Sequence, residues 1–228
     1  MGLVHDEHAV TDDQLAATLD RGWRDTVAID AAYARGELDD AGWHAARAAC
    51  IVPAYLAADT PQGGSGHTGT AADWEYSRGI VAEAIDRAGT FLDVGCANGL
   101  LMENVARWSG VEPYGLDIAP ELAALARSRY PHWAERIAVG NALEYRPAHR
   151  FDFVRTGLEY VPPPRRRALV AHLLEHVGRR VIIGKYNELV TARAIEASLD
   201  GFAIAGRAER PHRNDPRICY RVLWIDSV

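Results

Sequence analysis

Phe91-Leu92-Asp93-Val94-Gly95-Cys96-Ala97-Asn98-Gly99-Leu100-Leu101 is the stretch that decides the fold of this chain. It opens with an apolar run that alternates poorly, which is typical of a strand buried on both faces. Gly95 and Gly99 then interrupt the run before an apolar pattern resumes. The stretch therefore predicts a strand, a tight loop and the start of a helix. Such glycines permit a positive φ or the close approach of a ligand, which the first helical amides would face. A turn whose glycines serve geometry alone is the alternative.

The composition is that of a soluble globular protein. The chain has 228 residues, of which 48% are hydrophobic and 25% charged, enough for one domain with a modest appendage. Its net charge of −6 lacks the basic excess of proteins that bind phosphate backbones, which disfavours nucleic acid as a partner.

The cysteines and the longest apolar runs indicate the cellular compartment of the protein. Cys50, Cys96 and Cys219 are far apart and odd in number, which fits neither a disulfide framework nor a paired-cysteine metal site. No apolar run reaches the length of a membrane span or a signal core. We therefore expect a cytoplasmic protein without a membrane partner.

Residues 1–72 are predicted to form a helical extension that ends in a glycine-rich loop. A capping pattern at 11–14 starts one helix, a second runs over 25–35, and a third begins at Asp39 or Asp40 and is kinked or ended by Pro53. The loop over 59–72 is rich in Gly, Thr and Ser. The extension is either a lid over a substrate pocket or a layer packed outside the sheet, and the loop either closes over ligands or is only a hinge.

The second predicted domain, 73–228, alternates helices and strands. A capping box at 70–73 starts a helix expected to run to Gly89. Further helices are predicted from Leu101 to near Trp108, after Pro120, over 169–177 and over 188–199. Strands follow the first one in this order: 113–118, 136–140, 151–155, 181–184, and a terminal hairpin of 203–209 and 218–225. The alternation predicts a mostly parallel sheet with right-handed crossovers and helices on both faces, a three-layer αβα sandwich.

The ends of these strands carry residues suited to a nucleoside ligand. In an open parallel sheet, ligands bind outside the carboxyl ends of the strands, where the glycine loop, Asp117 and Asn141 are expected. An acid after the second strand can accept hydrogen bonds from both ribose hydroxyls. A dinucleotide fingerprint would need glycine at 95, 97 and 100, but the chain has Ala97 and Leu100, which counts against NAD.

Four ordered segments resemble the motifs of class I S-adenosylmethionine (SAM)-dependent methyltransferases. They are Leu-Asp-Val-Gly-Cys-Ala-Asn-Gly from position 92, Gly-Leu-Asp-Ile-Ala-Pro-Glu-Leu from 115, Gly-Asn-Ala from 140 and Phe-Asp-Phe-Val from 151. The likeness covers roughly residues 74 to 226. It implies a seven-stranded sheet with the last strand antiparallel, SAM as cofactor and S-adenosylhomocysteine (SAH) as product.

The resemblance also implies which residues bind the cofactor. The first motif would lie against the amino acid part of SAM, Asp117 would bind the ribose, and Ile118 would pack on adenine. Asn141 stands where the family more often has Asp, but its amide oxygen can still accept from the adenine amino group. Arg78 either pairs with the methionine carboxylate or is a surface residue. The full predicted set is Thr70, Trp74, Asp93, Gly95, Cys96, Ala97, Gly99, Asp117, Ile118, Asn141, Ala142, Thr156, Gly157 and Leu158.

Candidates for the catalytic residues are His67 and Tyr160. Many small-molecule relatives have a histidine pair in the segment that here contains Glu159 and Tyr160, which puts a histidine base there in doubt. Tyr160 could orient a substrate or form ordinary wall packing, and His67 in the glycine-rich loop is either a base or merely solvated. Residues 185–188 also border the expected pocket. The sequence shows no cluster of His and Asp residues that would indicate the divalent metal site of catechol-type relatives.

The predicted function is methyl transfer from SAM to a small molecule by in-line displacement. The alternatives are an RNA or nucleotide methyltransferase, and a nucleoside-ligand or NAD-binding protein without methyl transfer. Arg165-Arg166-Arg167 favours a solvated helix start over an RNA contact, because no aromatic residues are interleaved. A monomer and a homodimer both stay open.

Overall fold

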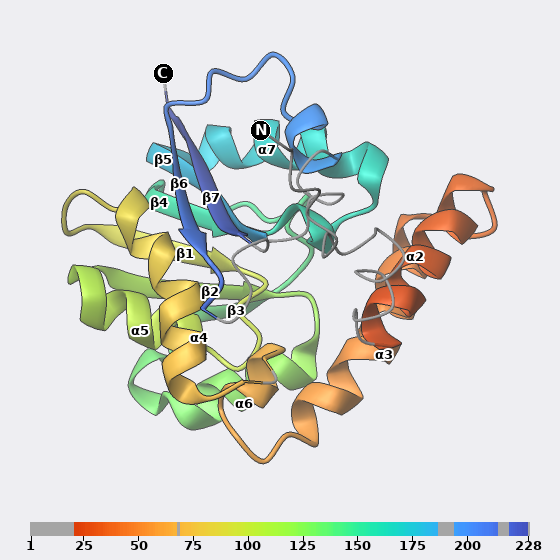
Figure 1. Ribbon diagram of the computed structural model, residues 1–228, viewed down its shortest axis with the longest axis horizontal. Helices are drawn as coiled ribbons and strands as arrows, with labels where there is room; N and C mark the ends of the chain where they lie inside the picture. The colour runs from red at the N-terminus through yellow and green to blue at the C-terminus, as the bar shows by residue number, and fades with distance from the viewer. Residues whose placement is uncertain (1–20, 68, 187–193, 214–218, 228) are drawn as a thin grey trace, which may run out of the picture. The chain divides into compact units, whose positions relative to one another are not determined.

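A computed structural model describes residues 21–67, 69–186, 194–213 and 219–227 (Figure 1). The chain divides into two compact units, Met1–Ile51 and Val52–Val228. The helix predicted after residue 11 lies mostly outside the described residues, as does the first half, 188–193, of the helix predicted over 188–199.

The described part of the first unit consists of α2 (Arg21–Ala34) and most of α3 (Asp40–Leu56). Gly36 follows α2 with a φ of +75°, and the Asp39 carboxylate accepts the Gly42 amide at the start of α3. The indole N–H of Trp43, a buried residue, donates to Asp30 at 2.8 Å and so joins the two helices. Pro53 lies inside α3, so the expectation that it ends the helix is wrong.

The second unit is built on one seven-stranded sheet. Its strands are β1 (Thr90–Val94), β2 (Glu112–Asp117), β3 (Ile137–Val139), β4 (Phe151–Thr156), β5 (Val177–Tyr186), β6 (Gly206–Pro211) and β7 (Cys219–Asp226). The strand order is β3-β2-β1-β4-β5-β7-β6, and only the pairs that involve β7 are antiparallel. The predicted mostly parallel sheet with an antiparallel last strand is confirmed. The strand order reverses between β1 and β4, which is where open sheets bind ligands.

Helices cover both faces of this sheet. They are α4 (Ala71–Arg78), α5 (Leu100–Ser109), α6 (Pro120–Arg129) and α7 (Arg166–His176). Phe91 packs in a core with α4 and α5, whereas its neighbour Leu92 packs in a separate core with α7. Because successive strand residues point to opposite faces, β1 is the buried middle of three layers, as its apolar run predicted.

Two predicted boundaries are wrong. The helix expected to reach Gly89 stops at Arg78 and continues as a short 3-10 helix, Gly79–Ala84. Gly79 is a poor helix former, and the fully buried Ile80 and Val81 follow the packing of the sheet face instead. Val177 begins β5 rather than ending α7, because it pairs with Phe151 of β4. None of the helices in the described ranges combines the length and hydropathy that crossing a bilayer requires.

Candidate functional site

The glycine loop after β1 is fastened to the end of β2. The amides of Gly95 and Cys96 donate to the Leu116 carbonyl at 2.8 and 3.1 Å, and the Ala97 amide donates to the Asp117 carboxylate at 2.8 Å. Gly95 and Ala97 have positive φ values of 76° and 46°. The left-handed conformation costs an alanine roughly 1–2 kcal/mol, so the bond to Asp117 holds a strained loop in place.

Asp117 stands at the carboxyl end of β2, where the ribose contact was predicted. Its second carboxylate oxygen accepts the Ala119 amide at 2.9 Å. Burial raises the pKa of Asp117, and the bonds from Ala119 and Ala97 act against that rise. Each oxygen keeps a further lone pair, so the carboxylate can still accept two ribose hydroxyls.

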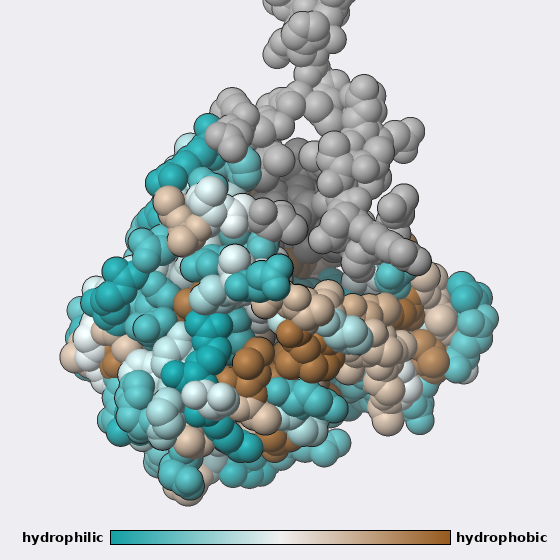
Figure 2. Space-filling model, turned by 90° about the horizontal axis from the view of Figure 1, so that it is seen from below, coloured by the Kyte–Doolittle hydropathy of each residue, from teal (hydrophilic) through white to brown (hydrophobic). Residues whose placement is uncertain are grey.

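Two apolar side chains beside Asp117 are exposed. Ile118 is 40% exposed, and Val139, which pairs with Asp117 in the sheet, is 42% exposed. Large apolar residues of this kind are few on the described surface, and Figure 2 shows apolar residues gathered on one face among hydrophilic ones. A flat aromatic base lying on Ile118 and Val139 would remove this apolar area from water. The Asn141 amide oxygen accepts the Leu143 amide at 3.0 Å, so it has one lone pair left for a base edge.

Arg155 on β4 organises a buried ionic network that the sequence did not reveal. Its guanidinium donates to the Gly184 carbonyl at 2.6 Å, to Asp93 at 3.3 Å and to the Tyr160 hydroxyl at 3.1 Å. Arg155 is 5% exposed and Asp93 1%. Burial raises the pKa of Asp93 to about 6, and the charge of Arg155 limits the rise. A charged residue within a buried strand was the signal that could have revealed Arg155.

The ring of Tyr160 lies directly on Gly95. A Cβ at Gly95 would come within 2.5 Å of a ring carbon, so the site requires glycine for space as well as for its positive φ. Burial raises the pKa of Tyr160 to about 12, although the nearby Arg155 acts in the opposite direction. The phenol is therefore protonated at neutral pH.

Arg78, at the end of α4, faces the same network. Its Nη1 atom is buried and has no hydrogen-bond partner in the described part of the chain. Burial and then the positive charge of Arg155 lower the pKa of Arg78, whereas Tyr160, Tyr55 and Glu159 raise it. An unsatisfied buried donor of a charged group is costly, which identifies Nη1 as a place for an anionic ligand atom.

The glycine-rich loop is docked on the glycine loop of β1. The buried Asn98 donates its amide to the Pro61 carbonyl at 2.7 Å and accepts the Leu100 amide at 3.2 Å. The indole of Trp74 donates to the Ser65 hydroxyl at 2.8 Å. The sequence did not reveal the role of Asn98, because its position within the motif does not show that its side chain is buried and reaches the neighbouring loop. Residues 61–65 therefore lie against the wall of the site.

Residues 91–179 match the family model described as a methyltransferase domain. This part of the chain is therefore similar to methyltransferase domains. No curated protein matches the chain at a significant level.

Solved structures share the fold of this chain at low identity. The N-methyltransferase NodS from Bradyrhizobium japonicum WM9, crystallised with SAH, is 15% identical, with 78% of this chain and 96% of that chain covered and a TM-score of 0.52. A ribosomal protein L11 methylase from Lactobacillus delbrueckii subsp. bulgaricus is 19% identical, with 69% of this chain and 79% of that chain covered and a TM-score of 0.50. The [4+2]-cyclase SpnF is 14% identical over 68% and 80%, also with a TM-score of 0.50.

Other predicted cofactor residues of the second unit differ in how far they are buried. Thr156 and Leu158 are fully buried and bring mainly backbone to the edge, as does the buried Cys96. Thr70 is exposed, and its hydroxyl is used in the capping box with Asp73, which is confirmed. The side chains of residues 185–188 lie outside the described part of the chain.

His67 lines a cavity of the second unit. Strand β6 runs parallel to β5 because both are antiparallel to β7, so the end of β6 and the start of β7 lie at the carboxyl edge too. A cavity of about 150 Å³ at this edge is lined by His67, Gly69, Asp73, Tyr76, His212, Arg213 and Tyr220. Arg213 lies 3.5 Å from Asp73 and stacks over the Tyr76 ring at 4.3 Å. Tyr160 is absent from the residues that line this cavity, so the two catalytic candidates line different parts of the edge.

Proposed function

We propose that this chain transfers the methyl group of SAM to a small-molecule acceptor and releases SAH. The observation that carries the proposal is the buried, unpartnered Nη1 of Arg78, which faces the Asp93–Arg155–Tyr160 network beside Gly95. The zwitterionic end of SAM contains the carboxylate that this nitrogen lacks. An NAD-binding protein would instead need room for a pyrophosphate at Ala97 and Leu100.

The chain's residues hold the cofactor by three separate contacts in this proposal. Arg78 binds the methionine carboxylate, Asp117 accepts from the ribose hydroxyls, and Ile118 with Val139 covers adenine. When bound, SAM supplies a methyl group on a sulfonium sulfur, which an in-line nucleophile displaces. The protein's contribution is to align that nucleophile and to exclude water.

The acceptor would enter through the cavity that contains His67. Its tyrosine, histidine and arginine lining fits a polar, partly aromatic small molecule. His67 would take a proton from an acceptor that must lose one, whereas Tyr160 would orient the acceptor or the cofactor, because its phenol does not titrate near neutral pH. The net charge of −6 supports a small acceptor over RNA. Residues 1–72 are proposed to act as the lid.

Isothermal titration calorimetry with SAH tests the cofactor assignment. We expect micromolar affinity, on the order of 8 kcal/mol, and no binding of NAD. Asp117→Ala should weaken SAH binding by about 10- to 100-fold, since hydrogen bonds to charged groups contribute about 1.5–3 kcal/mol. Asp152→Ala is a matched control, because Asp152 also accepts a backbone amide, that of Thr90 at 2.9 Å. Unchanged SAH affinity in Asp117→Ala would show that the ribose assignment is wrong.

Methyl transfer needs its own assay, because the similar fold of SpnF belongs to a protein named as a cyclase. The purified chain is incubated with methyl-labelled SAM and separate pools of metabolites and RNA. Label transferred to a metabolite is the expected result. Labelled RNA together with salt-sensitive tRNA association would favour the RNA alternative, and NAD binding without SAM binding would overturn the proposal.

A further inference from the structure

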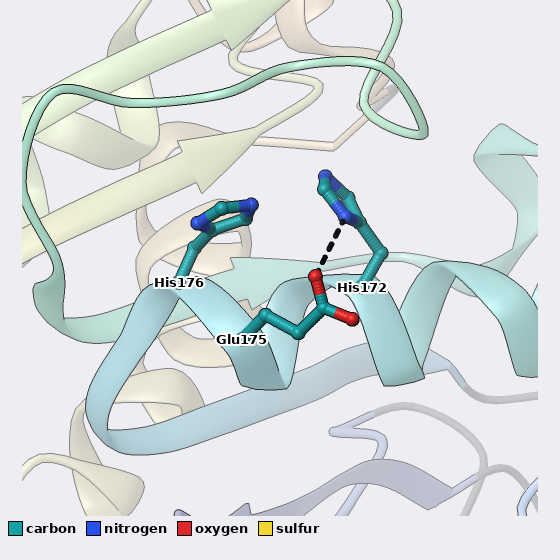
Figure 3. Close-up of side chains that lie close together, drawn as sticks. All are labelled: His172, Glu175 and His176. Carbon is teal, nitrogen blue, oxygen red and sulfur yellow. Dashed lines mark ion pairs between the residues drawn. The ribbon is translucent and has the colours of Figure 1, made fainter.

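Three side chains with metal-ligating atoms gather on the last turns of α7. His172, Glu175 and His176 are spaced i, i+3 and i+4, which places them on one face of the helix. One potential ligand atom from each lies within 4.8 Å of the other two. Figure 3 shows both imidazoles and the carboxylate standing on the same side of the helix, with the carboxylate near the ring of His172.

His172 is anchored on the side of its ring that faces away from Glu175. It is 8% exposed, and its Nε2 lies 2.9 Å from the Tyr145 carbonyl oxygen and 2.8 Å from Nη1 of Arg146. Its Nδ1 lies 3.8 Å from Oε2 of Glu175. In the tautomer whose Nε2–H donates to the Tyr145 carbonyl, Nδ1 keeps its lone pair and points toward Glu175, an arrangement common in metal-binding histidines; Arg146 then makes no hydrogen bond to Nε2.

His176 contributes a buried nitrogen that has no partner. Its Nε2 is inaccessible to solvent and makes no hydrogen bond within the described ranges. The two imidazole rings are edge to face, with centroids 4.7 Å apart. Burial, followed by the charges of His172 and Arg146, lowers the pKa of His176. A buried polar atom of this kind requires a ligand or a water.

We propose that His172, Glu175 and His176 bind one divalent cation of the zinc type, with water completing its coordination. Two imidazoles and one carboxylate suit Zn²⁺, whereas Mg²⁺ and Ca²⁺ require mainly oxygen ligands. His176 is the last residue of α7, where the free carbonyls of the helix favour a cation. The guanidinium of Arg146 opposes the ion, but it lies against Nε2 of His172, away from the nitrogen that faces Glu175. We therefore expect micromolar affinity.

The ion would have a structural role rather than a catalytic one. Strand β5 begins at Val177, directly after His176, so the cluster lies at the amino edge of the sheet, opposite the candidate cofactor site. The ion would fix the ring of His172, which in turn contacts the Tyr145–Arg146 segment between β3 and β4. The sequence analysis predicted no metal site. The His-x-x-Glu-His spacing was visible, but spacing alone does not show an anchored ring or a buried free nitrogen.

Zinc titration of the untagged full chain, in competition with a chromophoric chelator, tests the proposal. We expect one Zn²⁺ per chain, at least about 10-fold weaker binding in Glu175→Gln and about 100-fold weaker binding in His176→Ala. Glu175 and His176 are not fully buried, and circular dichroism would check that both variants fold. His132→Ala, which removes an exposed histidine of the 3-10 helix Pro131–Arg136, is the matched control and should bind as the unmodified chain does.

Thermal unfolding gives a second readout that does not depend on activity. Saturating Zn²⁺ should raise the Tm of the unmodified chain and of His132→Ala but not that of His176→Ala, because only a site present in the folded state stabilises it. Co²⁺ in the same site should give visible absorption that His176→Ala abolishes. Zinc binding that His176→Ala leaves unchanged, or binding too weak to compete with the chelator, would overturn the proposal.

Discussion

Replacing Arg78 with methionine should have opposite effects on stability and on cofactor affinity. The substitution keeps a long apolar side chain on α4 but removes the guanidinium whose Nη1 is buried without a partner in the described part of the chain. Most substitutions near a binding site weaken both properties together. A residue whose buried charge is used to bind an anionic ligand should affect stability and cofactor affinity in opposite directions.

The stability effect follows from the cost of the unsatisfied donor. A buried polar group without a partner costs about 1–3 kcal/mol, and Arg78 also repels Arg155. Against this, methionine loses contacts that the guanidinium makes with its neighbours. We expect the free energy of unfolding of the cofactor-free protein to be unchanged or to rise by about 1 kcal/mol.

The binding effect should be a clear loss. A hydrogen bond between charged groups contributes about 1.5–3 kcal/mol, so Arg78→Met should bind SAH roughly 10- to 150-fold more weakly. Methylthioadenosine, which has the adenosine and sulfur but no amino acid carboxylate, should bind both proteins equally. This comparison separates loss of the carboxylate contact from general damage to the site.

Urea unfolding and calorimetry with both ligands would measure these effects. Arg107→Met is the control, since Arg107 is an exposed arginine that pairs with Glu75 at 2.6 Å, and it should change neither ligand's affinity. The reasoning is refuted if Arg78→Met destabilises the free protein by more than about 1 kcal/mol, or weakens methylthioadenosine as much as SAH.

Three further predictions concern the same edge of the sheet. Gly95→Ala should lower the free energy of unfolding by about 1–2 kcal/mol for the positive φ and by about 1–3 kcal/mol for the clash with Tyr160. In urea unfolding, the double variant with Tyr160→Ala should regain only the part that is due to the clash. The Asp93 carboxyl should titrate near pH 6 by NMR rather than at 3.8. Because the pKa of Asp93 is raised in the folded state, the folded protein keeps a proton between pH 3.8 and about 6 that the unfolded chain has lost. The contribution of Asp93 to stability therefore falls as the pH rises through this range. A titration midpoint near 4 would contradict the buried network. Asn98→Ala should speed proteolysis of the 59–67 loop and weaken SAH binding. Asn104→Ala also loses one hydrogen bond to a backbone carbonyl, but it should leave both the proteolysis rate and SAH affinity unchanged. Equal behaviour of the two variants would argue against a docked loop.

The fold could be predicted because its signals are local. The run from Phe91 to Val94 showed a strand buried on both faces, and the capping box of Thr70 and Asp73 is present as expected. Failures occurred where tertiary contacts override local preference. Gly79 ends α4 early because the following residues pack on the sheet, and Val177 joins β5 because Phe151 is its partner.

The candidate site could be predicted only in part. Asp117 and Ile118 could be placed because motif order fixes the strand ends. Arg155 could not, since its role depends on Asp93, which lies 62 positions away and pairs with it across neighbouring strands. The sequence spacing also did not show whether Arg78 is a surface residue or binds the cofactor, because only the structure shows that its Nη1 is buried.

The position of Tyr160 constrains the chemistry of the proposed reaction. The ring of Tyr160 rests on Gly95, and its hydroxyl accepts a hydrogen bond from Arg155. With a pKa of about 12, this phenol does not take a proton near neutral pH. A base must therefore come from the cavity with His67 and His212, or the acceptor must be nucleophilic without one. If the double substitution His67→Ala with His212→Ala leaves the rate of methyl transfer unchanged between pH 6 and 9, the second possibility holds, and the acceptor atom is one that reacts before it loses a proton.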